Sequence, residues 1–217
     1  MPKAKIKKSA GIEEMPVGNK KTGFFDGFLD VWKQVLMKPA ETFKREKKNA
    51  DLGEGAKHIL IAGVIVGVLS VIQNAMLGTR ISAMLGGTSG TVYTLVATPV
   101  MTLVGWLIGA GVLLLVAKML GGKGSFNTQA WLTALYLAPV SVLAAVLALI
   151  PFVGSGLGIL VWLYGLYLLT LALCETHEYG MSKAALTWLL PVIVVFVLVA
   201  SLAATLIRSF GLASLMG

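Results

Sequence analysis

The sequence predicts an all-α membrane protein, a bundle of five transmembrane helices preceded by an amphipathic helix on the cytosolic side. Hydrophobic residues make up 57% of the 217 residues and charged residues only 13%, whereas charged residues are about 25% of a soluble domain. The charges are also unevenly placed, because residues 1–57 hold 13 of the 18 Lys and Arg and 8 of the 10 Asp and Glu. The rest of the chain is a series of apolar blocks, as expected for helices surrounded by lipid.

The N-terminal region divides into two parts. Residues 1–22 combine Lys, Gly and Pro with little hydrophobic patterning, so we expect a disordered basic tail. Residues 23–57 have the pattern of cytosolic interfacial helices. Phe25, Phe28 and Trp32 share one helical face with other apolar residues three or four positions apart, which predicts an amphipathic helix.

Pro39 ends this helix, and a second, more polar helix should follow it. Its basic residues come shortly before the first apolar block and are Lys44, Arg45, Lys47 and Lys48. An amphipathic helix followed by a basic stretch is typical of segments that lie on anionic headgroups. Packing of the apolar face against the underside of the bundle explains the same pattern, and the sequence leaves both alternatives open.

Five segments are long and apolar enough to cross the bilayer, which requires roughly 20 residues. They cover residues 59–77, 92–117, 130–150, 157–174 and 186–207, within a transmembrane domain at 58–208. Because the first apolar block begins only near residue 58, we expect no ordinary cleavable signal peptide. We expect Pro99 to bend the second span, and the short turn at 151–156 to make the third and fourth spans antiparallel neighbours.

The distribution of Lys and Arg predicts the orientation of the chain. With the N-terminus in the cytosol, 16 of these residues lie on the cytosolic side, including Lys118, Lys123 and Lys183. Only Arg80 and Arg208 lie on the other side. Cytosolic loops retain positive charge, so the C-terminus should be on the opposite side of the membrane. The net charge of +8 then indicates lipid headgroups as partners rather than nucleic acid.

Three pairs of glycines four residues apart occur in or next to the predicted spans. They are Gly63 with Gly67, Gly105 with Gly109, and Gly154 with Gly158. Such pairs let helix backbones approach closely. We expect most to be used for packing within the chain, and the sequence leaves open whether one serves a homo-oligomer.

Candidate chemistry is confined to the loop before the last span, where Glu175, His177 and Glu178 cluster and His58 could approach. No HExxH or CxxC spacing occurs, and Cys174 is the single cysteine. We therefore predict no catalytic residues, no metal site and no cofactor. The GGKGSF stretch around Lys123 departs from the spacing of a phosphate-binding loop. A tight turn whose lysine contacts lipid phosphates is the favoured interpretation.

Transport is the main alternative function. No ionisable residue lies in the middle of a predicted span, which argues against ion-coupled carriers. A passive pore or lipid-handling groove would need Thr98, Pro99, Tyr136 and Pro139 on facing helices.

Four stretches resemble the Yip1 domain family of five-span membrane proteins. They are Val31 to Phe43 (VWKQVLMKPAETF), Leu120 to Phe126 (LGGKGSF), Ala138 with Pro139, and Cys174 to Ala184 (CETHEYGMSKA). The resemblance covers about residues 24–207 and implies a five-helix fold. In eukaryotes such proteins act in the early secretory pathway with Rab-type GTPases and with each other. The compact basic arm of this chain is closer to short prokaryotic members, which implies a location in a prokaryotic cell membrane.

We therefore expect a non-enzymatic membrane protein with an interaction, scaffold or trafficking role. The cytosolic arm and the loops around Lys123 and Glu175 would present a surface to a protein partner, to another copy of the chain or to anionic lipid. A channel or a small-solute or lipid transporter, using uncharged polar residues inside the bundle, is the alternative.

Overall fold

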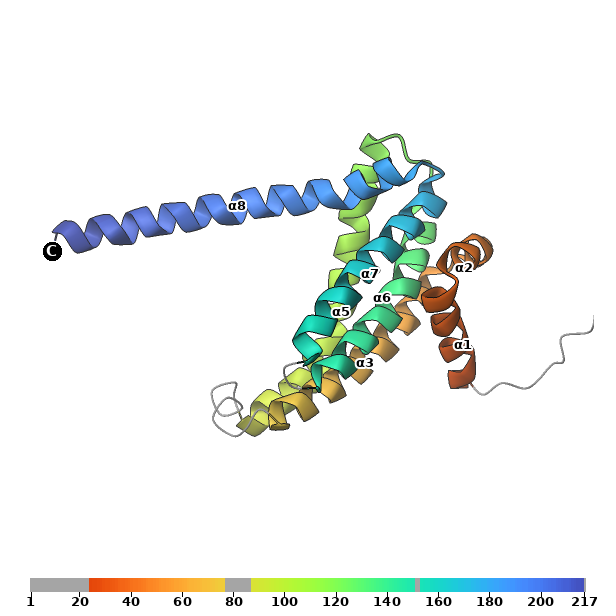
Figure 1. The fold of residues 1–217 in the computed structure, drawn as a ribbon, viewed down its shortest axis with the longest axis horizontal. Coiled ribbons are helices and arrows are strands. Elements are labelled where there is room, and N and C mark those ends of the chain that lie inside the picture. Colours follow the sequence, from red (N-terminus) through yellow and green to blue (C-terminus); the bar gives the residue numbers. More distant parts are fainter. Residues whose placement is uncertain (1–23, 77–86, 151–152, 217) are drawn as a thin grey trace, which may run out of the picture.

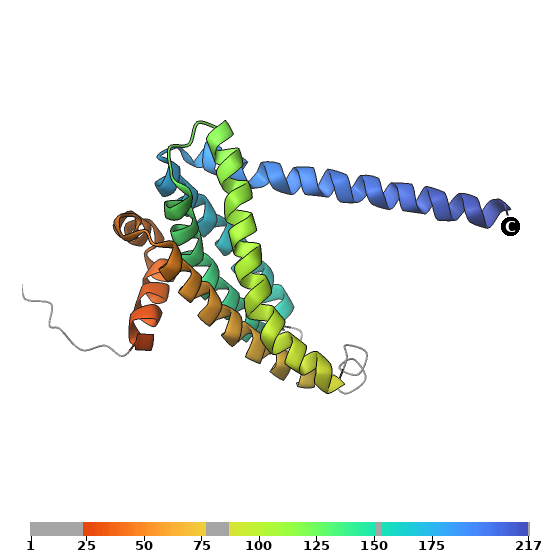
Figure 2. The ribbon, with the colours of Figure 1, turned by 180° about the vertical axis from the view of Figure 1, so that it is seen from behind.

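The structure is a computed structural model that describes residues 24–76, 87–150 and 153–216. These residues form helices joined by short connections. The tail predicted at 1–22 and Arg80 lie outside the described residues. Figures 1 and 2 show a bundle with a short arm on one flank and a long C-terminal helix that leaves the bundle. The predicted all-α fold is confirmed.

The arm consists of α1 (Phe24–Met37), α2 (Pro39–Glu46) and the short 3-10 helix η1 (Lys47–Asn49). The break between α1 and α2 follows from Pro39, which disfavours helical geometry at Lys38 and starts the next helix at its first position. The amphipathic helix expected from the spacing of Phe28 and Trp32 is therefore present. The second, polar helix is also present.

Among the residues that the structure describes, five further helices are long and apolar enough to cross a membrane, which confirms the predicted number of spans. They are α3 (Leu52–Met76), α5 (Gly87–Met119), α6 (Phe126–Ala148), α7 (Val153–His177) and α8 (Met181–Met216). Helices α6 and α7 pack side by side as antiparallel neighbours. Pro99, Pro139 and Pro191 lie inside α5, α6 and α8.

Several helices begin or end outside the apolar blocks of the sequence. α3 begins at Leu52 rather than near 58, because the side chain of Asp51 accepts a hydrogen bond from the Glu54 amide at 2.8 Å and caps the first turn. Later in the chain, α7 continues to His177, so Glu175 and His177 are helical rather than part of a loop. Polar helix ends of this kind extend beyond the hydrocarbon and leave no hydropathy signal.

Helix α6 is the centre of the bundle. It packs against α3, α5, α7 and the arm, and every residue from Gln129 to Leu135 is buried. Helices α3 and α5 also cross closely at Gly63, where an added Cβ would lie 2.6 Å from the Cα of Pro99. A glycine at this crossing lets the two backbones meet.

Helix α8 touches the bundle only through its first turns. There Ala184 is buried and the Trp188 indole nitrogen donates a hydrogen bond to the Thr170 hydroxyl at 3.0 Å. Beyond Pro191, every side chain up to Arg208 is exposed, and Figure 1 shows the helix extending away from the others. An apolar helix exposed on all sides is solvated by lipid rather than by water.

Candidate functional site

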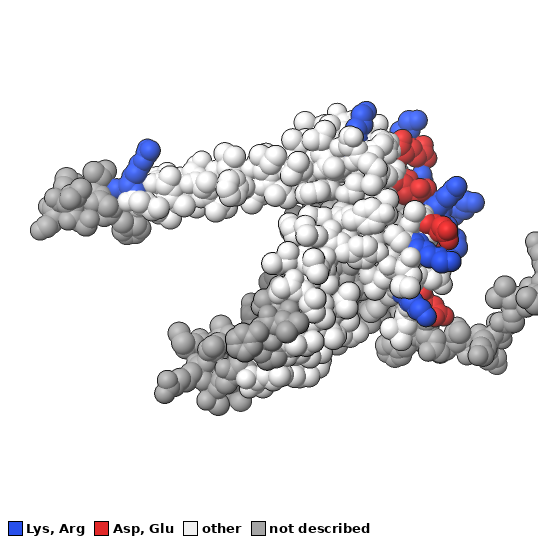
Figure 3. Space-filling view, in the orientation of Figure 1, with Lys and Arg blue, Asp and Glu red and all other residues white. Residues whose placement is uncertain are grey.

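The charged residues of the described segments gather at one end and along one flank of the bundle, which we call the charged face. It comprises the arm, the start of α3, and the segments around residues 118–123 and 175–183. Arg208, which lies in α8, is the one exception among the described residues. Figure 3 shows basic colour on this helix far from the other charges. Since charges avoid hydrocarbon, this face marks where the protein meets water and headgroups.

The arm is fixed to the bundle by its aromatic face. Trp32 donates a hydrogen bond from its indole nitrogen to Nδ1 of His58 at 2.8 Å, and both side chains are buried. The ring of Phe28 lies 4.3 Å from the ring of His58, measured between centroids. Trp32 also packs against Ala62 and Ala138. Phe28 and Trp32 therefore serve the packing of the arm against the bundle, one of the two alternatives that the sequence left open.

Backbone carbonyls of the arm, and of Ala50 directly after it, accept three further hydrogen bonds from the bundle. The donors are Trp131 to the Glu46 carbonyl at 2.9 Å, Tyr164 to the Leu36 carbonyl at 2.7 Å, and Asn127 to the Ala50 carbonyl at 2.9 Å. Beneath them, the fully buried ring of Phe43 joins an apolar cluster with residues of α6 and α7. These contacts order the arm as one layer on the bundle.

The basic side chains expected to form an interface are at the surface. Lys44, Arg45, Lys48 and Lys123 are exposed, whereas Lys47 and Glu175 are half-buried. The side chain of Phe25 lies outside the described residues. Most of the predicted interface residues therefore lie at the charged face. Phe28, Trp32 and His177 are instead buried beneath it.

Lys47 connects the arm to the end of α7. Its ammonium group lies 2.9 Å from Glu178 and 4.0 Å from Glu175. The hydrogen bond from Lys47, and then its charge, lowers the pKa of the exposed Glu178 carboxyl. Glu178 also has a φ of 57°, so this ion pair forms at a left-handed turn that ends α7.

His177 is a buried structural residue rather than a surface ligand. The Gly124 amide donates a hydrogen bond to its Nδ1 at 3.1 Å, so Nε2 carries the proton and donates to the Gln129 side-chain oxygen at 2.6 Å. Gln129 in turn donates to the carbonyl of Ala110 at 2.6 Å. These bonds join α5, α6 and α7. Gln129 was missed from the sequence, although an amide directly before the apolar span predicted at 130–150 was the available signal.

The glycine loop between α5 and α6 packs closely on this histidine. Gly121 has a φ of +84°, and a Cβ added at Gly122 would lie 2.6 Å from Nδ1 of His177. The Lys123 amide donates to the His177 carbonyl at 3.3 Å, and Ser125 caps α6 by accepting from the Thr128 amide. The loop amides therefore bond within the protein, as expected of a tight turn rather than a phosphate cradle.

His58 and His177 each have other partners, so His58 does not join the cluster at the end of α7. Within residues 24–76, 87–150 and 153–216, no group of three His, Cys, Asp or Glu side chains is placed to hold a metal ion.

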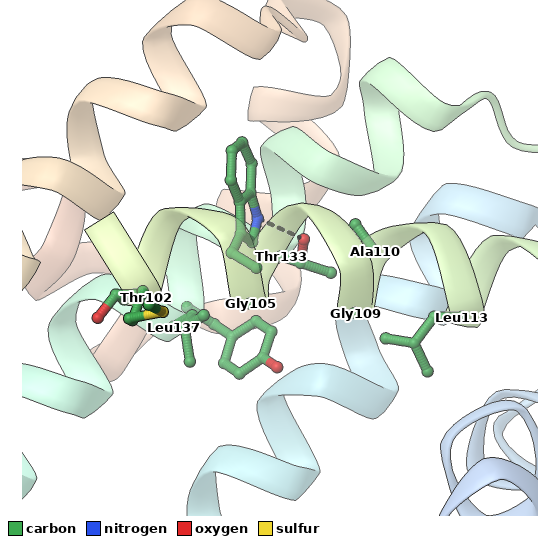
Figure 4. Close-up of a pocket in the computed structure, with 10 residues that line it drawn as sticks. Thr102, Gly105, Gly109, Ala110, Leu113, Thr133 and Leu137 are labelled. Atoms are coloured by element: carbon green, nitrogen blue, oxygen red, sulfur yellow. Dashed lines mark hydrogen bonds between the residues drawn. The ribbon is translucent and has the colours of Figure 1, made fainter. Parts of the chain in front are cut away.

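The structure does not assemble the polar path considered for transport. Tyr136 lines a hollow of about 250 Å³ between α5 and α6, which Figure 4 shows beside Gly105, Gly109 and Thr102. Pro139 instead lines a hollow facing α1. Pro99 and Thr98 pack against the glycines of α3. The four residues proposed for one pore therefore belong to different surfaces.

The glycine pairs have different surroundings. Gly63 and Gly67 lie at the α3–α5 crossing, and a Cβ added at Gly67 would lie at an ordinary 3.5 Å from Thr98. Added Cβ atoms at Gly105, Gly109 and Gly158 would meet nothing within 4 Å. A Cβ at Gly154, in the first turn of α7, would overlap the carbonyl oxygen of Leu147 near the end of α6.

A charged face carried on five apolar helices, with an ordered arm across it, defines a polytopic helical membrane protein. The model of the Yip1 domain family matches residues 33–203. Because the match covers most of the 217 residues, the chain belongs to the Yip1 domain family, a family of non-enzymatic membrane proteins. Comparison with curated proteins and with solved structures gave no match.

Proposed function

We propose that this protein is a membrane interaction protein of trafficking type, whose charged face is cytosolic and docks a protein partner. The observation that carries the proposal is the concentration of exposed charge on an ordered layer. The described segments place nearly all their charged residues there, and the arm that bears most of them is held to the bundle by side-chain hydrogen bonds. A surface ordered before binding loses little conformational entropy when a partner docks.

The arm offers both signs of charge to a partner. Lys44 and Lys48 project from α2 and η1 and have no ion pair among the described residues, while Asp51 and Glu54 follow at the start of α3. Mixed charges of this kind give orientation and specificity to association more than raw affinity. A partner with acidic groups opposite Lys44 and Lys48 fits this surface.

The polar side chains inside the spans give the transport alternative little support. Thr94, Thr102, Ser141, Ser201 and Thr205 each donate a hydrogen bond to a carbonyl three or four residues earlier in their own helix. Hydroxyls bonded in this way are satisfied locally and need no solute or water partner. They are also spread over α5, α6 and α8 rather than lining one passage.

The first experiment isolates the full chain in native lipid discs and identifies co-purifying proteins present in stoichiometric amount by mass spectrometry. Charge reversal in the Lys44→Glu, Lys48→Glu double variant should release the partner, because both side chains are exposed and support no packing. Arg208→Glu, at the far end of α8, is the matched control and should retain it. Recovery of the chain without a stoichiometric protein, or equal retention in both variants, would refute the docking role.

Orientation is tested separately, in intact cells that express the full chain. Cysteines are introduced one at a time at Lys48 and Arg208 in a Cys174→Ser background and labelled with a membrane-impermeant thiol reagent from outside. We expect labelling of the cysteine at 208 in intact cells and of the cysteine at 48 only after the membrane is opened. Labelling of the cysteine at 48 in intact cells would place the charged face on the outer side.

A further inference from the structure

An apolar hollow and a charged hollow lie next to each other on α1, and both are lined by Lys33 and Met37. From them we infer that the arm holds one glycerophospholipid of the adjacent leaflet, with an acyl chain between α1 and α6 and its phosphate at Lys33 and Lys38. This lipid site does not depend on the protein partner proposed above.

The first hollow is apolar. It has a volume of about 350 Å³ and lies between α1 and the second half of α6. Its lining consists of Leu29, Trp32, Lys33, Leu36, Met37, Pro139, Val142, Leu143 and Val146, of which only Lys33 is charged. The volume is within the range of ligand pockets, roughly 300 to 1,000 Å³. An apolar occupant is required, because no described residue of the α6 wall offers a polar side chain.

The second hollow is charged and lies between α1 and α2. It has a volume of about 520 Å³ and is lined by Asp30, Lys33, Gln34, Met37, Lys38, Glu41 and Arg45. Lys33 and Met37 line both hollows. A single molecule that is apolar at one end and charged at the other can therefore occupy both.

The position of the hollows relative to the bilayer favours a lipid over a soluble ligand. Figure 3 shows the charges of the described residues along the flank that carries the arm. Since charges avoid hydrocarbon, we place the arm at the depth of the headgroups. The apolar hollow is on the side of α1 that faces α6, a membrane-spanning helix. Acyl chains of the adjacent leaflet reach this space directly, whereas the charged hollow is at the depth of the headgroups.

Lys33 and Lys38 are free to hold the phosphate. Neither has an ion pair among the described residues, whereas Arg45 is bound to Glu46 at 2.8 Å and to the Gln34 side chain at 2.7 Å. A lysine can lay its methylene stem along apolar surface and place its ammonium group at the headgroup level. Lys33, which lines both hollows, has the position for this arrangement.

The carboxylates of the charged hollow limit the charge of the headgroup. Asp30 and Glu41 also line it, and neither has an ion pair with another described residue. A headgroup with several negative charges would be repelled by them. The site should therefore accept a phospholipid with one phosphate and discriminate against cardiolipin and polyphosphorylated lipids.

The wall of the apolar hollow is rigid on the α1 side. Trp32, which lines it, is held by its hydrogen bond to His58 and by its packing against Ala62 and Ala138. A preformed wall distinguishes this hollow from ordinary contact between lipid and the outer faces of the spans.

The test is native mass spectrometry of the full chain in detergent, with phosphatidylglycerol, phosphatidylethanolamine or cardiolipin added in turn. We expect one bound phospholipid per chain for the lipids with one phosphate. The Lys33→Gln, Lys38→Gln variant should weaken its retention by roughly 30-fold, as expected from the loss of two lysine attractions to a headgroup. Leu143→Trp, which fills the apolar hollow, should also abolish retention.

Matched controls separate this site from general lipid contact and from the protein partner. Lys44→Gln, Lys48→Gln removes two exposed charges outside the hollows, and Ile159→Trp adds the same bulk to a residue of α7 that is 62% exposed. Both controls should retain the lipid. Equal loss in controls and test variants, or preferred retention of cardiolipin, would overturn the proposal.

A second measurement locates the acyl chain without altering the protein. A phospholipid carrying a photoreactive diazirine on one acyl chain is incorporated into discs with the full chain and activated by light. Cross-links should concentrate on the α6 peptide that carries residues 139–146. Cross-links spread evenly over α5 and α8 would show only annular lipid and would refute the site.

Discussion

The indole nitrogen of Trp32 lies 2.8 Å from Nδ1 of His58, although the two residues are 26 positions apart in the sequence. This hydrogen bond joins the arm to the first membrane-spanning helix inside an apolar cluster. Phe28 and Trp131 pack their rings on the same histidine. A layer of aromatic contacts therefore supports the charged face and holds it in a fixed position on the bundle.

Trp32→Phe should loosen the arm while leaving the bundle intact. The change keeps an aromatic ring but removes the donor, which leaves Nδ1 of His58 buried and without its partner. An unsatisfied buried group costs about 1 to 3 kcal/mol, so opening of the arm should become about 5 to 150 times more frequent. Limited proteolysis of the α1–α2 region in detergent measures this opening.

Trp162→Phe is the control for this substitution, because it makes the same chemical change at a side chain that is 62% exposed on α7. It should leave the proteolysis rate of the arm near that of the unaltered protein. Equal rates in the two variants would show that the bond to His58 does not hold the arm.

The number of helices and the position of the charges could be predicted because both are properties of single segments. Each span is apolar over its own length. Pro39 ends α1 because its ring disfavours helical geometry at the preceding residue, Lys38. The bonds that support the charged face could not be predicted in this way. His177 and Gln129 are 48 positions apart, and only the packing of α6 against α7 brings them to 2.6 Å. From the sequence alone, His177 was therefore predicted to lie in a surface loop, whereas it is buried.

Gln129→Leu should destabilise the junction of α5, α6 and α7. The substitution replaces the amide with an apolar side chain of similar size, and it removes the acceptor for His177 and the donor to the Ala110 carbonyl. The loss of a buried partner costs about 1 to 3 kcal/mol. Thermal unfolding in detergent, followed by circular dichroism, should show a lower midpoint.

Gln73→Leu is the matched control in α3. Among the described residues, Gln73 makes one side-chain hydrogen bond, to the Ala148 carbonyl at 3.0 Å, and it is only half-buried. Its removal should cost about 1 kcal/mol or less. A midpoint for Gln129→Leu no lower than that for Gln73→Leu would contradict the role assigned to the Gln129 network.

Gly63→Ala and Gly67→Ala should differ in stability although they make the same change one helical turn apart. A Cβ at Gly63 would lie 2.6 Å from the backbone of α5 at Pro99, whereas a Cβ at Gly67 has an ordinary distance of 3.5 Å to Thr98. Overpacking against backbone costs about 1 to 3 kcal/mol. Gly67→Ala should leave the unfolding midpoint nearly unchanged, whereas Gly63→Ala should lower it. Equal midpoints for the two variants would show that α3 and α5 can move apart at Gly63 without loss of stability.

Lys47→Met should raise the pKa of the Glu178 carboxyl toward its ordinary value. In the folded protein the hydrogen bond and charge of Lys47 lower this pKa, so the ion pair is complete above the ordinary pKa of glutamate. It is lost as the pH falls through the lowered pKa, because the protonated carboxyl no longer attracts the ammonium group. Titration followed by carbon NMR of labelled glutamate side chains measures the shift.

Lys57→Met is the control for this titration, because Lys57 pairs with Glu54 at 2.6 Å and forms no ion pair with the described residues at the end of α7. It should leave the Glu178 pKa unchanged. Since the Glu178 side chain is 58% exposed, added salt should also reduce the difference between the unaltered protein and Lys47→Met. A Glu178 pKa that is the same with and without Lys47 would show that the arm and the end of α7 are not electrostatically coupled in solution.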